Sequence, residues 1–272
     1  MPEQEIEETA DYERARVKDH PPDRPMLLIV EDNPDLRKYI IKSLDAGFTC
    51  HEASDGNKGL DRAIKLIPDL IISDIMMPGV DGVEMCSKLK NDVTTSHIPI
   101  IMLTARGDMG SKIEGLITGA DDYIIKPFDA KELQVRVDNL IKQRKQLRER
   151  YRKEMVLGTE NLKLSHPDQK FLTRVSELVN DHITESDYTV GELAVEIGMS
   201  RSQLYRKILA LTDQSANEFM RNSKLKYAAS LFDHGHQNVT EVSLQAGFSS
   251  PSYFASCFRK LYGKNPKQYM TG

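Results

Sequence analysis

Ile72-Ser-Asp-Ile-Met-Met-Pro-Gly-Val-Asp-Gly82 contains the end of an apolar run, an acid where that run stops, and a turn with two glycines. Leu70 and Ile71 precede it and bring the apolar run to the length of a strand. Parallel α/β sheets place their functional groups beside the carboxyl ends of their strands. Asp74 is therefore a candidate site residue at the end of a buried strand.

Three other segments repeat this order of an apolar run followed by a polar group. They are Leu28-Ile-Val-Glu-Asp32, Met102-Leu-Thr-Ala105 and the stretch from Tyr123 to Lys126. Because parallel strands end at the same edge of a sheet, we expect the polar groups of all four segments to lie together. These groups are Glu31, Asp32, Asp74, Thr104 and Lys126.

Apolar periodicity alternates between strand and helix spacing from residue 26 to about residue 145. Strands are predicted at residues 26–31, 49–52, 70–74, 98–103 and 122–125. Helices are predicted at residues 35–46, 56–66, 83–91 and 108–118, and from about residue 130 onward. Five strands that alternate with five helices predict an α/β domain with a five-stranded parallel sheet.

The chain of 272 residues is long enough for two ordinary domains, each with its own core. No apolar run approaches the ~20 residues that span a bilayer. Glu3, Glu5, Glu7 and Glu8 stand where a signal peptide has basic and apolar residues, which predicts a cytoplasmic segment without membrane contact. Three well-separated cysteines disfavour a disulfide framework or a zinc site.

The net charge of −4 is unevenly distributed along the chain. Residues 1–141 carry −10, residues 142–167 carry +5 and residues 168–272 carry +1. The acidic front suits a cation site, whereas the rest can meet phosphates through local basic patches. We predict four regions: an acidic tail or linker (1–25), the α/β domain (26–145), a basic linker (146–167) and a helical domain (168–272). The last helix of the α/β domain either continues past residue 141 into the linker or ends near residue 145.

The predicted cluster of polar groups suits a carboxylate that accepts a phosphoryl group. Such a carboxylate needs a divalent cation, a second positive charge and a hydroxyl group around the phosphoryl oxygens. Lys126 supplies the charge and Thr104 the hydroxyl. Oxygen ligands for Mg²⁺ are available from Glu31, Asp32, Asp74 and the backbone carbonyl of Met76.

With these residues, the segment from about 26 to 145 resembles a response-regulator receiver domain, which has a flavodoxin-like, doubly wound fold. The resemblance implies that Asp74 is the residue phosphorylated. It further implies that Glu31, Asp32 and Met76 position Mg²⁺. Thr104 is then the switch hydroxyl, Tyr123 the switch aromatic, and Lys126 the phosphate partner before a cis bond to Pro127.

From residue 168 onward the periodicity is helical only. Leu193-Ala-Val-Glu-Ile-Gly-Met-Ser200 is repeated approximately as Val242-Ser-Leu-Gln-Ala-Gly-Phe-Ser249. Each copy predicts a short helix, a glycine turn and the start of a second helix, and a longer helix at 216–232 lies between the copies. The second helix of each pair places short polar and basic side chains outward, as a recognition helix requires. The pattern predicts an all-α tandem helix-turn-helix domain.

Gly247-Phe-Ser-Ser-Pro-Ser-Tyr-Phe254 and Phe258-Arg-Lys-Leu-Tyr-Gly-Lys-Asn-Pro-Lys-Gln-Tyr269 are similar to the signature of AraC-type transcriptional activators. Asp213, Ala216 and Met270 depart from the Gly, Pro and Arg that are common there. The resemblance implies two recognition helices in successive major grooves of promoter DNA. The expected contacts are Arg201, Ser202, Gln203, Arg206, Lys207, Ser250, Ser252, Tyr253, Arg259 and Lys260. Of these, Arg201, Gln203 and Arg206 suit base edges, and Lys207, Arg259 and Lys260 suit phosphates.

The two resemblances together predict a phosphorylation-dependent transcription regulator of a two-component phosphorelay. The expected partners are a histidine kinase in cis or in trans, double-stranded promoter DNA, a second copy of the chain and RNA polymerase. Neither a kinase domain nor a separate enzyme activity is expected. The alternatives are the C-terminal output half of a membrane hybrid histidine kinase, a phosphate-sink adaptor, and a phosphatase-like enzyme with Asp74 as nucleophile. The last would need a second acid at the place that Met76 occupies.

Overall fold

The computed structural model describes residues 24–105, 119–157 and 165–271. It divides into two compact units, and the main boundary along the chain falls between Gln143 and Arg144. The N-terminal unit is an α/β domain, and the C-terminal unit is helical. The predicted helix at residues 108–118 lies outside the described residues.

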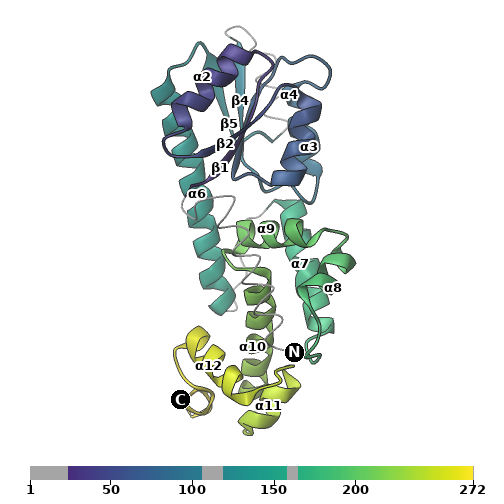
Figure 1. The fold of residues 1–272 in the computed structure, drawn as a ribbon. Helices are drawn as coiled ribbons and strands as arrows, with labels where there is room; N and C mark the ends of the chain where they lie inside the picture. Colours follow the sequence, from purple (N-terminus) through teal and green to yellow (C-terminus); the bar gives the residue numbers. More distant parts are fainter. Residues whose placement is uncertain (1–23, 106–118, 158–164, 272) are drawn as a thin grey trace. The chain divides into compact units, whose positions relative to one another are not determined.

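The N-terminal unit is built on a five-stranded parallel sheet, as the alternating pattern predicts (Figure 1). The strand order is β2-β1-β3-β4-β5. The strands are β1 (Met26–Val30), β2 (Thr49–Ala53), β3 (Leu70–Asp74), β4 (Ile100–Ala105) and β5 (Asp122–Lys126). Strands β1 and β3 are buried along their whole length because helices cover both faces of the sheet.

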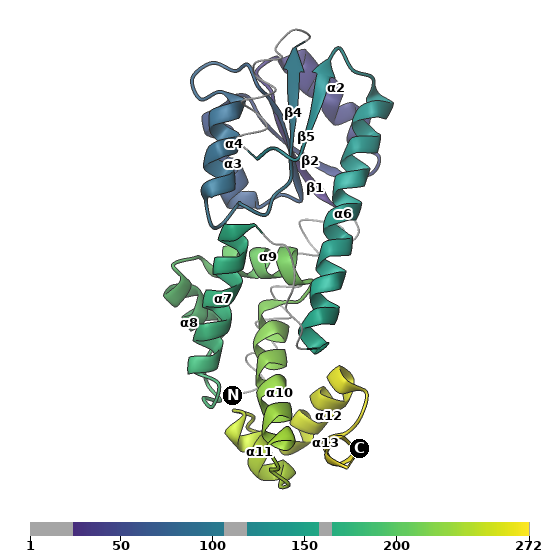
Figure 2. The ribbon, with the colours of Figure 1, turned by 180° about the vertical axis from the view of Figure 1, so that it is seen from behind.

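Four described helices pack on this sheet, two on each face (Figure 2). They are α2 (Pro34–Leu44), α3 (Gly56–Leu66), α4 (Gly82–Asn91) and α6 (Ala130–Leu157). Helices α2 and α6 share one core, in which Leu44 and Val137 are buried. Helices α3 and α4 share the other, which contains Ala63 and Met85. The predicted doubly wound arrangement is therefore confirmed.

Strand β4 begins at Ile100, two residues after its predicted start. Pro99 explains the difference, because proline has no N–H to donate to a strand ladder. Its carbonyl nevertheless accepts a hydrogen bond from the N–H of Ile71 at 2.9 Å. The strand also ends later than predicted, at Ala105 instead of residue 103, so Thr104 lies within it, one residue before its end.

Helix α6 continues past residue 145 and ends at Leu157 after 28 residues. Of the two possibilities that the sequence left open, the structure has the continuous helix. Leu133 and Val137 anchor its first turns in the core of the α/β unit, and Leu140 and Ile141 pack beside them. The helix thus passes from one unit into the other without a break in its backbone hydrogen bonding.

The C-terminal unit contains seven described helices and matches the predicted tandem arrangement. They are α7 (His166–Asp181), α8 (Val190–Ile197), α9 (Arg201–Thr212), α10 (Ala216–Asp233), α11 (Val239–Gln245), α12 (Pro251–Tyr262) and α13 (Pro266–Met270). Helix pairs α8–α9 and α11–α12 are the two helix-turn-helix motifs, and α10 connects them (Figure 1). Each motif turns at a glycine with positive φ, +75° at Gly198 and +69° at Gly247.

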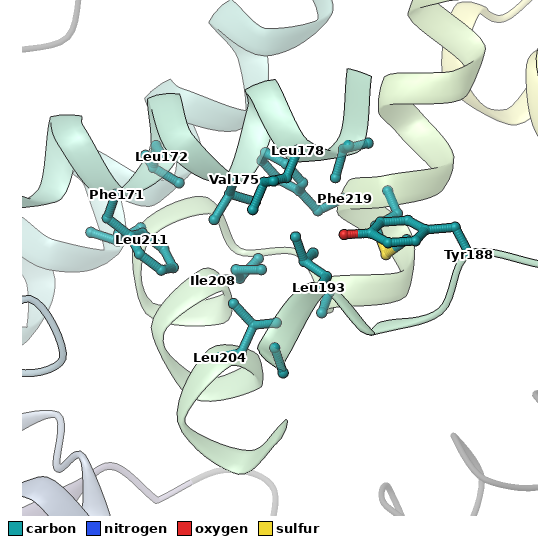
Figure 3. Packing of buried hydrophobic residues seen from close by; sticks show 14 residues of the cluster. Phe171, Leu172, Val175, Leu178, Tyr188, Leu193, Leu204, Ile208, Leu211 and Phe219 are labelled. Carbon is teal, nitrogen blue, oxygen red and sulfur yellow. The ribbon is translucent and has the colours of Figure 1, made fainter. Parts of the chain in front are cut away.

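Each helix-turn-helix motif has its own apolar core. In the first core, α7 packs on α8, α9 and the start of α10 through residues such as Val175, Leu193 and Ile208 (Figure 3). The second core joins the end of α10 to α11, α12 and α13 through an aromatic cluster. There the rings of Phe232 and Phe258 meet edge to face at 5.7 Å between centroids.

Helix starts in this unit are determined by side chains that accept hydrogen bonds from backbone N–H groups. Ser200 and Gln203 form a capping box at the start of α9, and Ser215 and Glu218 form another at the start of α10. Asp213 ends α9 in the left-handed region with φ +58°. The departure from the common glycine therefore leaves the turn geometry intact, since aspartate tolerates this region better than most residues.

Candidate functional site

Three carboxylates meet at the carboxyl ends of β1 and β3. One oxygen from each of Glu31, Asp32 and Asp74 lies within 4.8 Å of the others. Glu31 and Asp74 are buried, whereas Asp32 is exposed. The structure thus brings Asp74 to two acids that lie 42 and 43 residues earlier in the sequence, because β1 and β3 are neighbours in the sheet.

Lys126 stands between two of these acids. Its Nζ lies 2.9 Å from Oε2 of Glu31 and 2.9 Å from Oδ1 of Asp74. The side chain of Lys126 is 24% exposed, so part of it remains open to solvent at the end of β5. The following peptide bond to Pro127 is cis, as the resemblance implies. Two buried acids that share one lysine are mutually dependent charges rather than a set of unrelated surface charges.

The environment of Glu31 shows that negative charge is concentrated at this edge. Burial raises the pKa of Glu31, and the charge of Asp74 adds to that effect, against the opposing hydrogen bond from Lys126. The backbone N–H of Asn33 donates to Glu31 at 3.2 Å. Arg37 donates to the backbone carbonyl of Glu31 at 2.7 Å and so holds the loop after β1 in place.

The donor set fits Mg²⁺. This ion prefers oxygen ligands and usually combines one or two carboxylates with water. Glu31, Asp32 and Asp74 supply carboxylate oxygens close enough together for a single cation. Met76 lies in the loop after β3 with its side chain 66% exposed, which leaves the apolar group outside the cluster.

The two predicted switch residues lie on the neighbouring strands β4 and β5. Thr104 is 3% exposed and donates to the carbonyl of Ala105 at 3.4 Å. The N–H of Ile75 donates to the carbonyl of Leu103 at 3.0 Å, which fixes the end of β3 against the strand that carries Thr104. Tyr123 is half-buried and packs against the core beneath α3 and α4.

Gly82 contributes to the site in a way that the sequence analysis did not predict. A Cβ atom there would lie 2.0 Å from the carbonyl oxygen of Asp74. The N–H of Gly82 donates to the carbonyl of Ile75 at 2.9 Å, so α4 starts directly against the end of β3. Only the turn was expected from the glycine pattern. The close approach depends on α4 beginning at Gly82 itself, which periodicity does not specify.

The predicted DNA contacts lie on α9 and α12. Those with exposed side chains are Arg201, Ser252, Tyr253, Arg259 and Lys260, and those with half-buried side chains are Ser202, Gln203, Arg206 and Ser250. Gln203 and Ser250 also have local roles. Gln203 accepts from the N–H of Ser200 at 2.9 Å in the capping box, and Ser250 caps α12 by accepting from the N–H of Tyr253 at 3.3 Å.

Lys207 does not fit the prediction of a phosphate contact. Its side chain is fully buried, and its Nζ lies 2.7 Å from Oδ1 of Asp168 and 5.0 Å from the ring centroid of Phe171. Burial acts to raise the pKa of Asp168, but the Lys207 ammonium and the hydrogen bonds from Ser165 and Ser96 together hold that pKa below its ordinary value. Lys207 therefore joins α9 to α7 inside the domain.

Arg221 is a further polar residue beside the second recognition helix. Its guanidinium donates to the hydroxyl of Tyr253 at 3.4 Å, from α10 to α12. Sequence reasoning missed this contact because Arg221 lies in the connecting helix, outside both motifs.

Among the described residues, no helix combines the length and apolar character needed to cross a bilayer.

Comparisons with known proteins agree with this division of the chain. Residues 27–138 match the response regulator receiver domain, and residues 193–272 match a helix-turn-helix domain. Histidine kinase P4 of Formosa agariphila is 38% identical over 247 residues, which are 91% of this chain and 18% of that protein. The DNA-binding dual master transcriptional regulator RpaA of Synechocystis is 44% identical over 119 residues, 43% of this chain and 49% of that protein. The receiver domain structure of a signal transduction histidine kinase from Syntrophus aciditrophicus is 33% identical, with a TM-score of 0.42, over 44% of this chain and 91% of that one. The chain thus spans less than half the length of both curated relatives.

Proposed function

Because this chain carries a response regulator receiver domain followed by an AraC-type helix-turn-helix domain, we propose that it is a phosphorylation-controlled, DNA-binding regulator of a two-component system. The observation that carries the proposal is the position of Lys126, which bridges Glu31 and the acceptor Asp74 at 2.9 Å. The acid cluster beside it has the oxygen donors that a divalent cation needs.

Asp74 is proposed to accept the phosphoryl group from a phosphohistidine on a kinase. A carboxylate oxygen of Asp74 forms a bond to phosphorus as the P–N bond of the donor breaks, and the imidazole leaves with that electron pair. Lys126 offers its ammonium to the phosphoryl oxygens as a point charge. Glu31, Asp32, Asp74 and the backbone carbonyl of Met76 would hold Mg²⁺, which would neutralise negative charge during the transfer.

Thr104 and Tyr123 are proposed to convert phosphorylation into a change of surface. A phosphoryl group on Asp74 adds nearly two negative charges and new hydrogen-bond acceptors. The Thr104 hydroxyl, now bonded to the carbonyl of Ala105 at 3.4 Å, gains a stronger charged acceptor and turns toward it. The movement of Thr104 makes room for the ring of Tyr123, so the β4–β5 edge changes shape.

The helical domain is proposed to bind promoter DNA through α9 and α12. Arg201 and Arg206 suit guanine edges, and Arg259 and Lys260 suit phosphates. Affinity should fall steeply with added salt, since cationic side chains release counterions from DNA on binding. An adaptor that acts by protein contacts alone would show no such DNA affinity.

The likeness to histidine kinase P4 favours one source of the phosphoryl group. That likeness extends over 91% of this chain and includes both domains. We propose that this pair of domains serves as the cytoplasmic output of a hybrid histidine kinase. A separate kinase that phosphorylates Asp74 in trans is the alternative.

Intact-mass spectrometry with acetyl phosphate and MgCl2 tests the acceptor role. The unsubstituted chain should gain the mass of one phosphoryl group, and Asp74→Asn should gain none. A modified Asp74→Asn protein would show that another residue is the acceptor. EDTA should remove the gain from the unsubstituted chain, because the cation is part of the proposed site.

Light scattering with beryllofluoride, a phosphoryl mimic, tests whether phosphorylation controls dimerisation. A dimer that forms only with the mimic, and not in Asp74→Asn, supports the proposed switch. A dimer under every condition would instead indicate that helix α6 controls dimerisation, independently of phosphorylation. A monomer under every condition would contradict phosphate-driven dimerisation.

A further inference from the structure

The turn of the second helix-turn-helix motif contacts the loop that leads into the first motif. Gly247, in that turn, lies against the backbone of Ile183 and Glu185, between α7 and α8. A Cβ atom on Gly247 would be 2.6 Å from the carbonyl oxygen of Ile183 and 3.1 Å from that of Glu185. Such distances leave no space for a side chain, so the second motif is in backbone contact here with the loop that leads into the first motif.

Lys224 of α10 closes this contact. Its side chain is buried with 9% exposure, and its Nζ donates to the carbonyl of Glu185 at 2.6 Å and to that of Gly247 at 3.4 Å. One carbonyl belongs to the loop that leads into the first motif, and the other to the turn of the second motif. A buried ammonium needs such partners, since an unpaired one would change its protonation state or leave the interior.

This joint has no counterpart at the equivalent turn of the first motif. Gly198 and Gly247 occupy the same position in the sequence repeat and have similar positive φ angles, +75° and +69°. Nothing lies within 4 Å of a Cβ placed on Gly198. The glycine of the first motif is therefore required only by the turn, whereas Gly247 is required by both the turn and the joint.

We propose that Lys224 and Gly247 form a joint that fixes the angle between the two recognition helices, so that both can enter DNA at once. Lys224 is then a positioning residue, because its ammonium acts through the backbone carbonyls of Glu185 and Gly247. This inference rests on the proposed DNA-binding function. Rigid presentation of two linked contacts increases affinity for a two-part site without adding any new contact.

The test compares Gly247→Ala with Gly198→Ala in the full chain. Both variants introduce the same left-handed strain, but only Gly247→Ala forces the two motifs apart. The probe is duplex DNA that the unsubstituted chain selects from a random-sequence pool. Gly247→Ala should bind it at least about tenfold more weakly than Gly198→Ala. A version of the probe with one half-site scrambled should bind the two variants equally. Equal affinity of both variants for the intact probe would overturn the joint.

A measurement without DNA separates failure of the joint from failure of the proposed function. Residual dipolar couplings of the α9 and α12 amides should fit one alignment tensor in the unsubstituted chain and require two in Lys224→Met. Lys224→Arg, which keeps a buried donor, should retain one tensor. A single tensor in both Lys224→Met and Gly247→Ala would overturn the joint. If the unsubstituted chain selects no DNA sequence, the proposed function fails while these couplings still decide the joint. Should Lys224→Met lose its helical circular dichroism, Gly247→Ala provides the result.

Discussion

Two lysines of this chain, one in each unit, were expected to meet phosphate, and the structure treats them differently. Lys126 ends a strand and reaches two acids at an edge that is partly open to solvent. Lys207 lies within a helix and is buried against Asp168. A strand end in a parallel sheet determines where a side chain points, whereas a helix surface changes from exposed to buried within one residue.

The largest effect is expected from breaking the buried pair. Lys207→Met should lower the free energy of unfolding by about 3–5 kcal/mol, because it leaves the Asp168 carboxylate buried without its partner. The double variant Asp168→Asn with Lys207→Met should recover most of that loss, since neither residue then carries a charge. Urea unfolding followed by circular dichroism measures both. An unchanged stability in Lys207→Met would mean that Lys207 is free to act at the surface.

Lys126→Met should lower the free energy of unfolding by a smaller amount, and Mg²⁺ should reverse that loss. Removal of the ammonium leaves Glu31 and Asp74 without a shared cation. The expected decrease in the free energy of unfolding is about 1–3 kcal/mol. A divalent ion bound by the same acids restores the charge balance, so MgCl2 should stabilise Lys126→Met more than the unsubstituted chain. Thermal unfolding with and without MgCl2 measures the difference. Lys207→Met is the matched control, and MgCl2 should not restore its stability.

The smallest effect is expected from an exposed ion pair in the helical unit. Nδ1 of His182 lies 3.0 Å from Glu185, and that carboxylate raises the pKa of His182 above its ordinary value of 6.5. A raised folded-state pKa stabilises the fold below pH 6.5, and this contribution is lost as the pH rises through the folded value. Unfolding curves measured at a series of pH values above 6.5 should show a slight decline in the free energy of unfolding, and His182→Gln should abolish that decline. A decline that persists in His182→Gln would have to come from another group.

The fold was largely predictable because buried strands and amphipathic helices leave strong periodic patterns. The grouping of Glu31, Asp74 and Lys126 was equally readable, since buried charges need partners and the topology allows few places for them. Lys207 could have been placed correctly as well. It falls three residues after Leu204 and four before Leu211, inside the apolar stripe of α9. The pattern of basic residues was given more weight than that spacing.

Other details depend on three-dimensional contacts that no local pattern specifies. The hydrogen bond between Arg221 and Tyr253 joins residues 32 positions apart in the sequence. Lys224 reaches a carbonyl 39 residues earlier in the chain. The capping role of Gln203 is different, because a serine followed three residues later by glutamine is a recognisable helix start. That signal was present in the sequence and was interpreted only as DNA contact.

Gly82 has a consequence for how this protein can diverge. Every other amino acid would place a Cβ atom 2.0 Å from the carbonyl oxygen of Asp74. A library of all single substitutions should therefore show position 82 to be about as intolerant as position 74, although glycine offers no functional group. Neutral substitution is therefore excluded at this position, and any lineage that changes it must first move the start of α4 away from the strand that carries Asp74.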